Sequence, residues 1–434
     1  SCNESGLFSD EALDVITKFP FVTVEKGQGF NDGSGAYAET KIVAQLKAVK
    51  ERNPNISTVF YMNAVLSWYF YRMDTTYHQH PEQWLYDENG DVVKEGGDSH
   101  FNPPKGGMLI FNHGLEAVRE FWKSVCINAT KTGYVDGCFS DSSQVGSHGA
   151  DKKLNTSTNA TFEQGKITTM SEMTAYFGGT AGQPYEGDGV LIGKKPDQQG
   201  INSFQIEFFS ANEGSIEELL QGVEQGYMVQ AHVVPDSLKA CGCACQTMTD
   251  SLAAFLIGAG ENCYYGTGAW IITGLEDVQN RWCPDLFERP LGPPLANATK
   301  DAEGIYHRNF SSGTSVQFNT KTNKGYIHWA GDAPAPAPAP PSPPGPQPQP
   351  QCGDMLENTA VAKNDVAPAI HTENVADCCS HCLNISDCAI WAWHGEQSPA
   401  MCHFHAANSI INPGHRKGCW AGVVKNSSTF HRTW

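Results

Sequence analysis

Two carboxylates, Asp141 and Glu207, could form a catalytic pair, because each lies near the end of an apolar run. Asp141 follows the alternating apolar run 135–139, among small residues that leave room for a ligand. Glu207 lies late in the run 204–208, where strand alternation puts it on one face with Gln205 and puts Phe208 on the other. Two carboxylates that converge across one cleft are what glycosidic bond cleavage needs, one as nucleophile or base and one as proton donor.

Both carboxylates also have a structural interpretation. Asp141 could cap a loop by accepting hydrogen bonds from backbone N–H groups. Glu207 could be a hydrogen-bonding residue that lines the interior of the sheet. The sequence does not give the separation of the two carboxyl groups, which would distinguish a retaining from an inverting hydrolase.

Polar residues also follow or interrupt other apolar runs, at positions suited to binding a substrate. These candidates are Glu25 with its neighbour Lys26, Asn63, His113 and His232. A single histidine within a strand, such as His232, is more typical of a hydrogen-bonded interior residue than of a catalyst.

An aromatic stretch after the second apolar run contains Trp68 and Tyr71. The C–H faces of a pyranose ring pack well on aromatic rings, so these residues could form a sugar-stacking wall. The alternative is hydrophobic packing beneath a long loop.

The elements that must position these residues alternate between β-rich runs and amphipathic helical stretches, the pattern of a parallel sheet wrapped by helices. Eight such alternations favour a (β/α)₈ TIM-type barrel, in which catalytic side chains stand at the C-terminal ends of the strands. The predicted strands are 21–24, 58–62, 108–111, 135–139, 190–192, 204–208, 228–233 and 263–265. The predicted helices are 39–51, 115–126, 162–176, 215–225 and 248–258.

The chain divides at a proline-rich segment. From 333 to 351 the sequence is almost entirely proline, alanine and glutamine, a composition that favours an extended polyproline rod over a packed core. We therefore predict a large domain at 1–330 with a small β appendage at 288–329, a linker at 331–351 and a small domain at 352–434. At 434 residues, the chain is long enough for two domains.

Composition excludes several kinds of partner. Lys and Arg total 29 against 47 Asp and Glu, a formal charge of −18 that would repel nucleic acid and anionic lipid headgroups. The longest apolar stretch is far shorter than the roughly 20 residues that span a bilayer. No phosphate-binding loop, HExxH motif or nucleophile elbow occurs, so we expect neither a cofactor nor a catalytic metal.

Cysteines and N-glycosylation sequons both predict a secreted, extracellular protein. Fifteen cysteines suit disulfides formed in an oxidising compartment. Residues 1–5 carry no apolar signal-peptide core, so either a leader has already been removed or the evidence for export has to come from elsewhere, which these cysteines and the sequons provide. The sequons begin at Asn3, Asn55, Asn128, Asn155, Asn159, Asn297, Asn309, Asn384 and Asn426.

The cysteines before the linker are even in number, as full internal pairing requires. Three of them, Cys241, Cys243 and Cys245, lie close together in the sequence. In an exported chain such cysteines more often form separate disulfides with distant partners than bind a metal.

Several segments of the large domain resemble the glycoside-hydrolase-like (β/α)₈ proteins. The resemblance implies a polysaccharide-related barrel with Asp141 at the usual acidic position, and carbohydrate as the partner. The segments are 86–91 (YDENGD), 136–141 (DGCFSD), 252–260 (LAAFLIGAG), 291–294 (LGPP) and 306–314 (YHRNFSSGT).

The small domain resembles a PAN/apple domain, a disulfide-stapled module that binds protein or carbohydrate. The resemblance rests on Cys352, Cys378-x₃-Cys382-x₅-Cys388, Trp391 or Trp393, Cys402 and Cys419. It implies three pairs, Cys378 with Cys402, Cys382 with Cys388, and Cys352 with Cys419. Cys379 is then left over, either buried as a small apolar residue or bonded to another chain.

The sequence is compatible with two functions. The first is a secreted carbohydrate-active protein, a glycoside hydrolase or a degenerate relative, whose small domain binds glycans or proteins. The alternative is a non-catalytic extracellular structural subunit of a wall, matrix or filament. In that case the linker and the small domain would contact neighbouring copies and mediate self-assembly.

Overall fold

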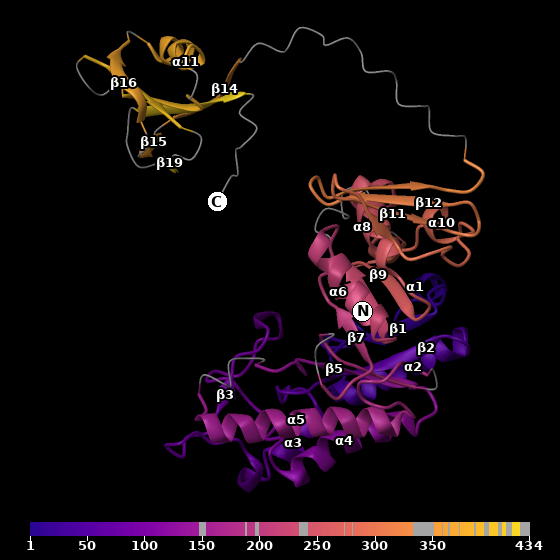
Figure 1. Cartoon of the computed structure of the whole chain (residues 1–434). Helices are drawn as coiled ribbons and strands as arrows, with labels where there is room; N and C mark the ends of the chain where they lie inside the picture. The colour runs from indigo at the N-terminus through magenta and orange to yellow at the C-terminus, as the bar shows by residue number, and fades with distance from the viewer. Residues whose placement is uncertain are drawn as a thin grey trace. The chain divides into compact units, whose positions relative to one another are not determined.

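The computed structural model divides into two compact units, Ser1–Ala333 and Pro334–Trp434, each described here by itself (Figure 1). The residues that the structure describes are 1–146, 153–186, 189–195, 199–233, 242–272, 274–279, 281–332, 351–357, 359–362, 365–372, 374–385, 388–394, 399–406, 410–413 and 419–425. Most of the predicted linker lies outside these ranges.

Parallel strands form the centre of the large unit. One sheet has the order β1 (Phe21–Val24), β2 (Ser57–Asn63), β5 (Gly137–Asp141), β6 (Val190–Ile192), and a second has the order β7 (Ser203–Ile206), β8 (Met228–Val233), β9 (Cys263–Thr267). A parallel bridge between Gly193 and Phe204 connects the two sheets. The mixed α/β class is therefore confirmed, whereas closure into a (β/α)₈ barrel stays a prediction.

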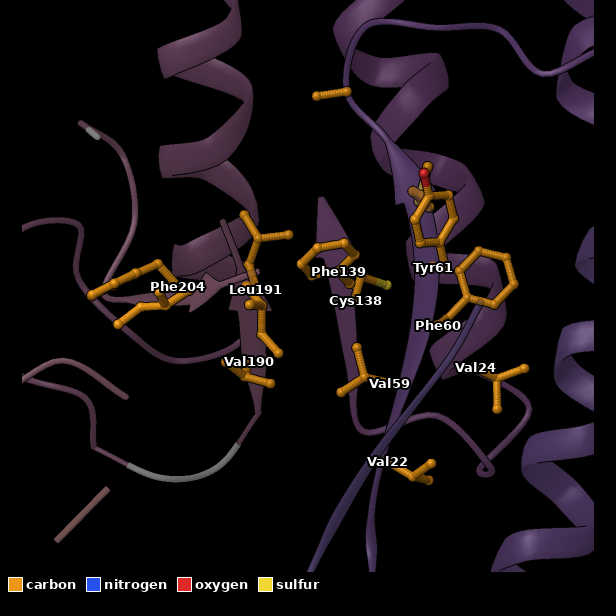
Figure 2. Close-up of a cluster of buried hydrophobic side chains, with 14 of the residues drawn as sticks. Val22, Val24, Val59, Phe60, Tyr61, Cys138, Phe139, Val190, Leu191 and Phe204 are labelled. Atoms are coloured by element: carbon orange, nitrogen blue, oxygen red, sulfur yellow. The ribbon is translucent and has the colours of Figure 1, made fainter. Parts of the chain in front are cut away.

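The central strands are continuous apolar runs because their side chains are buried on both faces of the sheet. Val59, Phe60, Tyr61 and Met62 on β2 are all fully buried, because both faces of the sheet are covered. Figure 2 shows side chains from β1, β2, β5, β6 and β7 gathered in this cluster.

Helices follow the strands as the alternation predicted. The longer ones are α2 (Ala38–Arg52), α4 (Glu116–Thr130), α5 (Thr156–Tyr176), α6 (Glu213–Glu224) and α8 (Gln246–Gly258). The shorter ones are α1 (Asp10–Ile16), α3 (Arg72–Tyr77), α9 (Leu275–Gln279) and α10 (Pro284–Phe287), with 3-10 turns at Pro81–Gln83, Ser99–Phe101 and Gly242–Ala244. Asparagine caps begin two of the long helices: the side chains of Asn155 and Asn212 accept hydrogen bonds from the first turns of α5 and α6.

The predicted third barrel strand, 108–111, is wrong. Its first half is β4 (Met108–Leu109), which pairs antiparallel with β3 (Lys94–Glu95) in the long excursion between β2 and α4. Its second half makes antiparallel bridges, Ile110 with Leu66 and Phe111 with Trp84. The described residues therefore contain seven strands in parallel pairing, and Asp141 ends the third of these along the chain.

An antiparallel sheet occupies the region of the predicted β appendage. Its strands are β10 (Thr299–Lys300), β11 (Ile305–Asn309), β12 (Ser315–Asn319) and β13 (Lys324–His328), and it lies against α8 (Figure 1). The two approach so closely at Gly325 that an added Cβ would lie 2.4 Å from the Cβ of Ala253. Arg308 fastens the sheet by donating to the carbonyl oxygens at the C-terminal end of α8.

In its described residues, the small unit has a five-stranded antiparallel sheet, a two-stranded sheet and one helix. The strands are β14 (Gln351–Glu357), β15 (Thr359–Ala362), β16 (Asp365–His371), β17 (Ile390–His394), β18 (Met401–His405), β19 (Ile410–Pro413) and β20 (Cys419–Lys425), and the helix is α11 (Val375–Leu383). Disulfides Cys378–Cys402 and Cys382–Cys388 tie α11 to its surroundings, and these are two of the pairs that the PAN/apple resemblance implied. The structure describes the backbone but not the side chains of Cys352 and Cys419, so their pairing stays a prediction.

Two expectations about the remaining cysteines are wrong. Cys379 takes part in a disulfide, so it is not left over. Full pairing in the large unit also fails, because Cys2 and Cys263 are free thiols. Disulfides Cys126–Cys138 and Cys243–Cys283 are present, Cys245 is disulfide-bonded, and Cys241 lies outside the described residues.

Candidate functional site

Asp141 and Glu207 both form ion pairs with the same lysine, Lys194. Asp141 is the last residue of β5, Lys194 follows β6 and Glu207 follows β7, so all three stand at the same edge of the parallel sheets. The Lys194 Nζ lies 3.0 Å from Asp141 Oδ1 and 2.5 Å from Glu207 Oε2. Because both oxygens contact one nitrogen, they are at most 5.5 Å apart.

The second oxygen of Asp141 is held from the neighbouring strand β2. The Tyr61 hydroxyl donates to Asp141 Oδ2 at 2.5 Å, and Asn63 Nδ2 donates to the same atom at 3.3 Å. The parallel register explains both contacts, because it pairs Asn63 with Asp141 and Tyr61 with Phe139. Figure 2 shows the Tyr61 ring within the apolar cluster, with its hydroxyl at the outer end.

Asn63 is itself fixed in orientation by the backbone. Its Oδ1 accepts hydrogen bonds from the N–H groups of Val65 at 2.8 Å and Leu66 at 2.6 Å. The amide nitrogen is therefore directed at Asp141 and at the hydroxyl of Ser142, 3.2 Å away. Ser142 has a φ of 61°, a left-handed conformation that a residue with a Cβ rarely adopts.

A second cation, Lys26, lies near Asp141 at the end of β1. Its Nζ is 3.3 Å from Glu25 Oε2, and it sits 4.8, 5.5 and 5.4 Å from the ring centres of Tyr61, Trp68 and Phe101. Such contacts with aromatic faces stabilise a partly desolvated ammonium group. Glu25 and Lys26 are both largely buried.

Electrostatics favours the ionised form of Asp141. Burial alone would raise its pKa, but the charges of Lys194 and Lys26 and the hydrogen bond from Tyr61 outweigh burial and lower the pKa to about 2. Burial likewise opposes the charge on Lys194, and Asp141 and Glu207 overcome this effect and raise its pKa. The site therefore presents a permanently charged carboxylate at ordinary pH, which is what a nucleophile or an electrostatic stabiliser requires.

Four other predicted substrate-binding residues are buried. Trp68 and Tyr71 are 4% and 2% exposed, so packing beneath the loop, rather than a sugar-stacking wall, describes them. His113 is fully buried between Thr169 Oγ1 and the carbonyl of Ala64, and burial lowers its pKa to about 3. His232 is also buried, with a pKa of about 3 for the same reason.

Two residues of the site, Lys194 and Tyr61, were not predicted from the sequence. Lys194 comes two residues after the buried strand β6, so it carries the same kind of positional signal as Asp141. Tyr61 lies inside an apolar run and has no local signal. Its part in the site depends on the register between β2 and β5.

Two hollows of the large unit differ in their relation to this cluster. A pocket of about 400 Å³ shares Lys26 with the cluster and is also lined by Phe30, Tyr37, Lys41 and Phe70. A pocket of about 260 Å³ is lined by Phe21 and Cys263, at the beginnings of β1 and β9. The second pocket is therefore at the opposite end of the strands from Asp141.

Neither a metal cluster nor a membrane-spanning helix is found in the part of the chain that the structure describes. There, no group of three or more His, Cys, Asp or Glu side chains is placed to hold a metal ion. The helices within those same ranges are all too short or too polar to cross a bilayer.

A parallel α/β sheet with carboxylates just beyond its strands is an architecture of glycoside-hydrolase-like proteins. Residues 50–314, more than half of the chain, match the family model described as Hypothetical glycosyl hydrolase family 15. The chain belongs to this family, and membership implies interaction with carbohydrate. No curated protein matches the chain.

Solved structures of glycoside hydrolases resemble the chain only distantly. The glycoside hydrolase domain of PelA from Pseudomonas aeruginosa is 9% identical, with a TM-score of 0.37 and coverage of 62% of this chain and 93% of that domain. The α-galactosidase from Lactobacillus brevis is 9% identical, with a TM-score of 0.41 and coverage of 100% and 54%. The α-amylase from Geobacillus thermoleovorans is 10% identical, with a TM-score of 0.39 and coverage of 98% and 94%. These TM-scores are too low to support an argument about the site.

Proposed function

We propose that the large unit is a complete (β/α)₈ barrel that hydrolyses glycosidic bonds, with Asp141 and Glu207 as its two carboxylates. The observation that carries this proposal is their convergence on Lys194 at the C-terminal edge of the parallel strands. Family membership supports the class of reaction.

Electrostatics supports the role of Asp141, and exposure supports the role of Glu207. Asp141 is the nucleophile or base, because its pKa of about 2 keeps it ionised. Tyr61 and Asn63 orient its second oxygen and leave the one beside Lys194 for the reaction. Glu207 is the proton donor, since its side chain is 35% exposed and can reach the glycosidic oxygen of a bound sugar.

The spacing of the carboxylates supports retention of configuration. Retaining hydrolases hold their two carboxyl groups about 5 to 5.5 Å apart, whereas inverting ones need about 6.5 to 9.5 Å to admit a water. The upper limit of 5.5 Å between the nearest oxygens falls in the shorter class. NMR of the first anomer released would test this, and the inverted anomer would contradict it.

The direct test is hydrolysis of a panel of plant, fungal and bacterial polysaccharides by the intact protein, with release of reducing sugar as the readout. Asp141→Asn keeps the shape of the side chain and removes its charge. We expect it to lower turnover by about a thousandfold or more, as loss of a covalent or charge-stabilising group does.

Asp32→Asn is the matched control for this test. Asp32 also pairs with a lysine, Lys41 at 2.9 Å, and also has a pKa of about 2, but it lies outside the cluster. Turnover should be unchanged in this variant. Equal activity of wild type and Asp141→Asn would remove Asp141 from the mechanism.

A second candidate function has one observation in its favour. The Lys194 ammonium occupies the space between the two carboxylates, as it would in a barrel that has lost catalysis. The protein would then be a non-catalytic extracellular structural subunit of a wall, matrix or filament. Retention on polysaccharide without any hydrolysis, together with concentration-dependent assembly in light scattering, would favour this function over the hydrolase.

We also propose that the protein is secreted and N-glycosylated. Support comes from the disulfides and from the sequons, because Asn55, Asn128, Asn155, Asn297, Asn309 and Asn384 are exposed. Asn3 and Asn159 are half-buried, and Asn426 lies outside the described residues. Expression through a secretory pathway, followed by treatment with a peptide N-glycosidase, should increase electrophoretic mobility; unchanged mobility would reject glycosylation.

The small unit is proposed to be a PAN/apple-like module that binds glycan or protein. The support is the pair of disulfides around α11 in the spacing of that domain. We expect the intact protein to be retained on immobilised polysaccharide more strongly than a chain that ends at Asp332. Equal retention would indicate that the small unit does not bind these glycans.

A further inference from the structure

We propose that Phe208 and Trp270 form an aromatic platform that binds one pyranose ring of a glycan next to Glu207. The inference rests on the proposed function, because it names where a substrate of that site would be held. It also replaces the sugar-stacking wall expected at Trp68 and Tyr71, whose rings are buried.

The first observation is the exposure of Phe208. The strand β7 ends at Ile206, so Phe208 lies in the turn that follows and does not obey the alternation predicted for it. It is 64% exposed, whereas Phe204 and Ile206 on the same strand are 0% and 5% exposed. A single exposed apolar side chain is ordinary on a protein surface, but this one directly follows the candidate proton donor in the chain and contacts a second aromatic ring.

Trp270 supplies the second ring. It follows β9, at the same edge of the second parallel sheet, and its ring centre lies 6.4 Å from that of Phe208 at an interplanar angle of 87°. The backbone at Trp270 is anchored, because its carbonyl accepts a hydrogen bond from the N–H of Cys2 at 2.9 Å. The two rings therefore form a corner with one face against the other's edge.

His232 supports both the platform and Glu207. Its ring centre is 3.9 Å from that of Trp270, and its imidazole also interacts with the backbone at Glu207 and Gly268. Burial keeps this histidine neutral, so no charge competes for the tryptophan face.

The chemistry of the platform fits a sugar better than other ligands. A pyranose ring presents apolar C–H faces that stack on aromatic rings and equatorial hydroxyls that bond to polar groups around them. Phe208 and Trp270 offer the ring surfaces, and the half-exposed carboxylate of Glu207, the residue before Phe208, offers polar atoms. Since Glu207 is the proposed proton donor, the ring bound here lies next to the scissile bond.

The test is affinity electrophoresis in gels that contain starch, galactomannan, xyloglucan or mixed-linkage β-glucan. The full chain carrying Asp141→Asn is the reference, so that the polysaccharide is not consumed during the run. We expect this reference to be retarded by at least one of the four. Adding Phe208→Ala or Trp270→Ala should then weaken binding about tenfold, and Trp270→Phe should restore part of it.

Tyr326→Ala in the same background is the control. Tyr326 is equally exposed, at 64%, but it lies on β13 of the antiparallel sheet, so binding should not change. The platform is refuted if none of the four polysaccharides retards the reference, or if Phe208→Ala binds as the reference does. Because the readout is binding in a hydrolytically disabled chain, a platform that binds while the wild type hydrolyses nothing would refute only the hydrolase. Hydrolysis by the wild type with Phe208-independent binding would refute only the platform.

Discussion

Two of the regions of the large unit that contain buried charge use it differently. Between α8 and the antiparallel sheet, Arg308 donates to the carbonyls of Leu256, Ile257 and Ala259, and Asp250 accepts from the N–H of Gly325. These charges are satisfied mainly by backbone groups. At the edge of the parallel sheets, Asp141, Lys194 and Glu207 are satisfied by one another.

This difference in the partners of the charges distinguishes a structural contact from a candidate functional site. The charges at α8 complete the hydrogen bonds of a helix end and a strand, so a ligand would have nothing to replace. The charges at Asp141 and Glu207 pair through side chains that remain 20% and 35% exposed. A ligand can exchange such contacts for its own, which is the property expected of a binding or catalytic site.

The largest expected effect is that of Lys194→Met. This change leaves Asp141 and Glu207 facing each other without a cation, and removal of one partner from a buried charge cluster typically costs several kcal/mol. We expect the free energy of unfolding to fall by about 4 kcal/mol. Urea denaturation monitored by circular dichroism measures it.

Lys195→Met is the matched control for Lys194→Met. Lys195 is the next residue, but its side chain is 53% exposed and pairs with Glu218 at the surface, 3.2 Å away. Exposed pairs contribute about 0 to 1 kcal/mol. Similar losses in both variants would mean that the cluster at Asp141 is no more than a surface ion pair.

The structural region should respond somewhat less to loss of its cation. Arg308→Met keeps the apolar stem and removes the three hydrogen bonds at the end of α8, at 2.9, 3.1 and 2.7 Å. We expect a loss of about 3 kcal/mol in unfolding free energy. Glycan binding by the folded variant should be unchanged. Weaker binding would mean that this region also contributes to the candidate site.

Acid should weaken the Asp141 cluster by a predictable amount. The carboxyl has an ordinary pKa of 3.8 in the unfolded chain and a pKa of about 2 in the folded one. Its contribution is therefore complete above about pH 4 and is lost as the pH falls towards 2, a change on the order of 2 kcal/mol. Asp141→Asn lacks this contribution, so its stability should fall less between pH 4 and pH 2 than that of the wild type.

The smallest effect concerns Asp250. Asp250→Asn keeps an oxygen that can accept from Gly325 N–H and loses the charge that faces Lys324, whose side chain is 50% exposed. We expect a loss of about 1 kcal/mol in unfolding free energy and no change in any activity. A change in polysaccharide hydrolysis would assign this region a part in the site.

Much of the parallel sheet could be predicted because its strands are short apolar runs bounded by polar residues. The runs 21–24, 190–192 and 228–233 coincide with β1, β6 and β8. The run 108–111 has the same composition, yet it pairs with β3 in a local antiparallel arrangement. Apolar character shows that a segment is buried, but the partner of a strand depends on distant residues.

The candidate site could be predicted only in part, because Lys26 and Asn63 were predicted together with the two carboxylates but Lys194 and Tyr61 were not. Asp141 and Glu207 have a positional signal, because each comes near the end of an apolar run. Their contacts with Lys194 and Tyr61 depend on strand order and register, which no local pattern contains. The exposure of Phe208 was missed for a related reason, since β7 ends two residues before it.

Because of its left-handed backbone, position 142 should respond differently to selection for stability and to selection for activity. A residue with a side chain in that conformation costs about 1 kcal/mol or more, whereas glycine adopts it freely. Ser142 also places a hydroxyl 3.2 Å from Asn63 Nδ2, which glycine would lack. Libraries at position 142 sorted for heat resistance alone should therefore enrich glycine, and libraries sorted for turnover should retain serine.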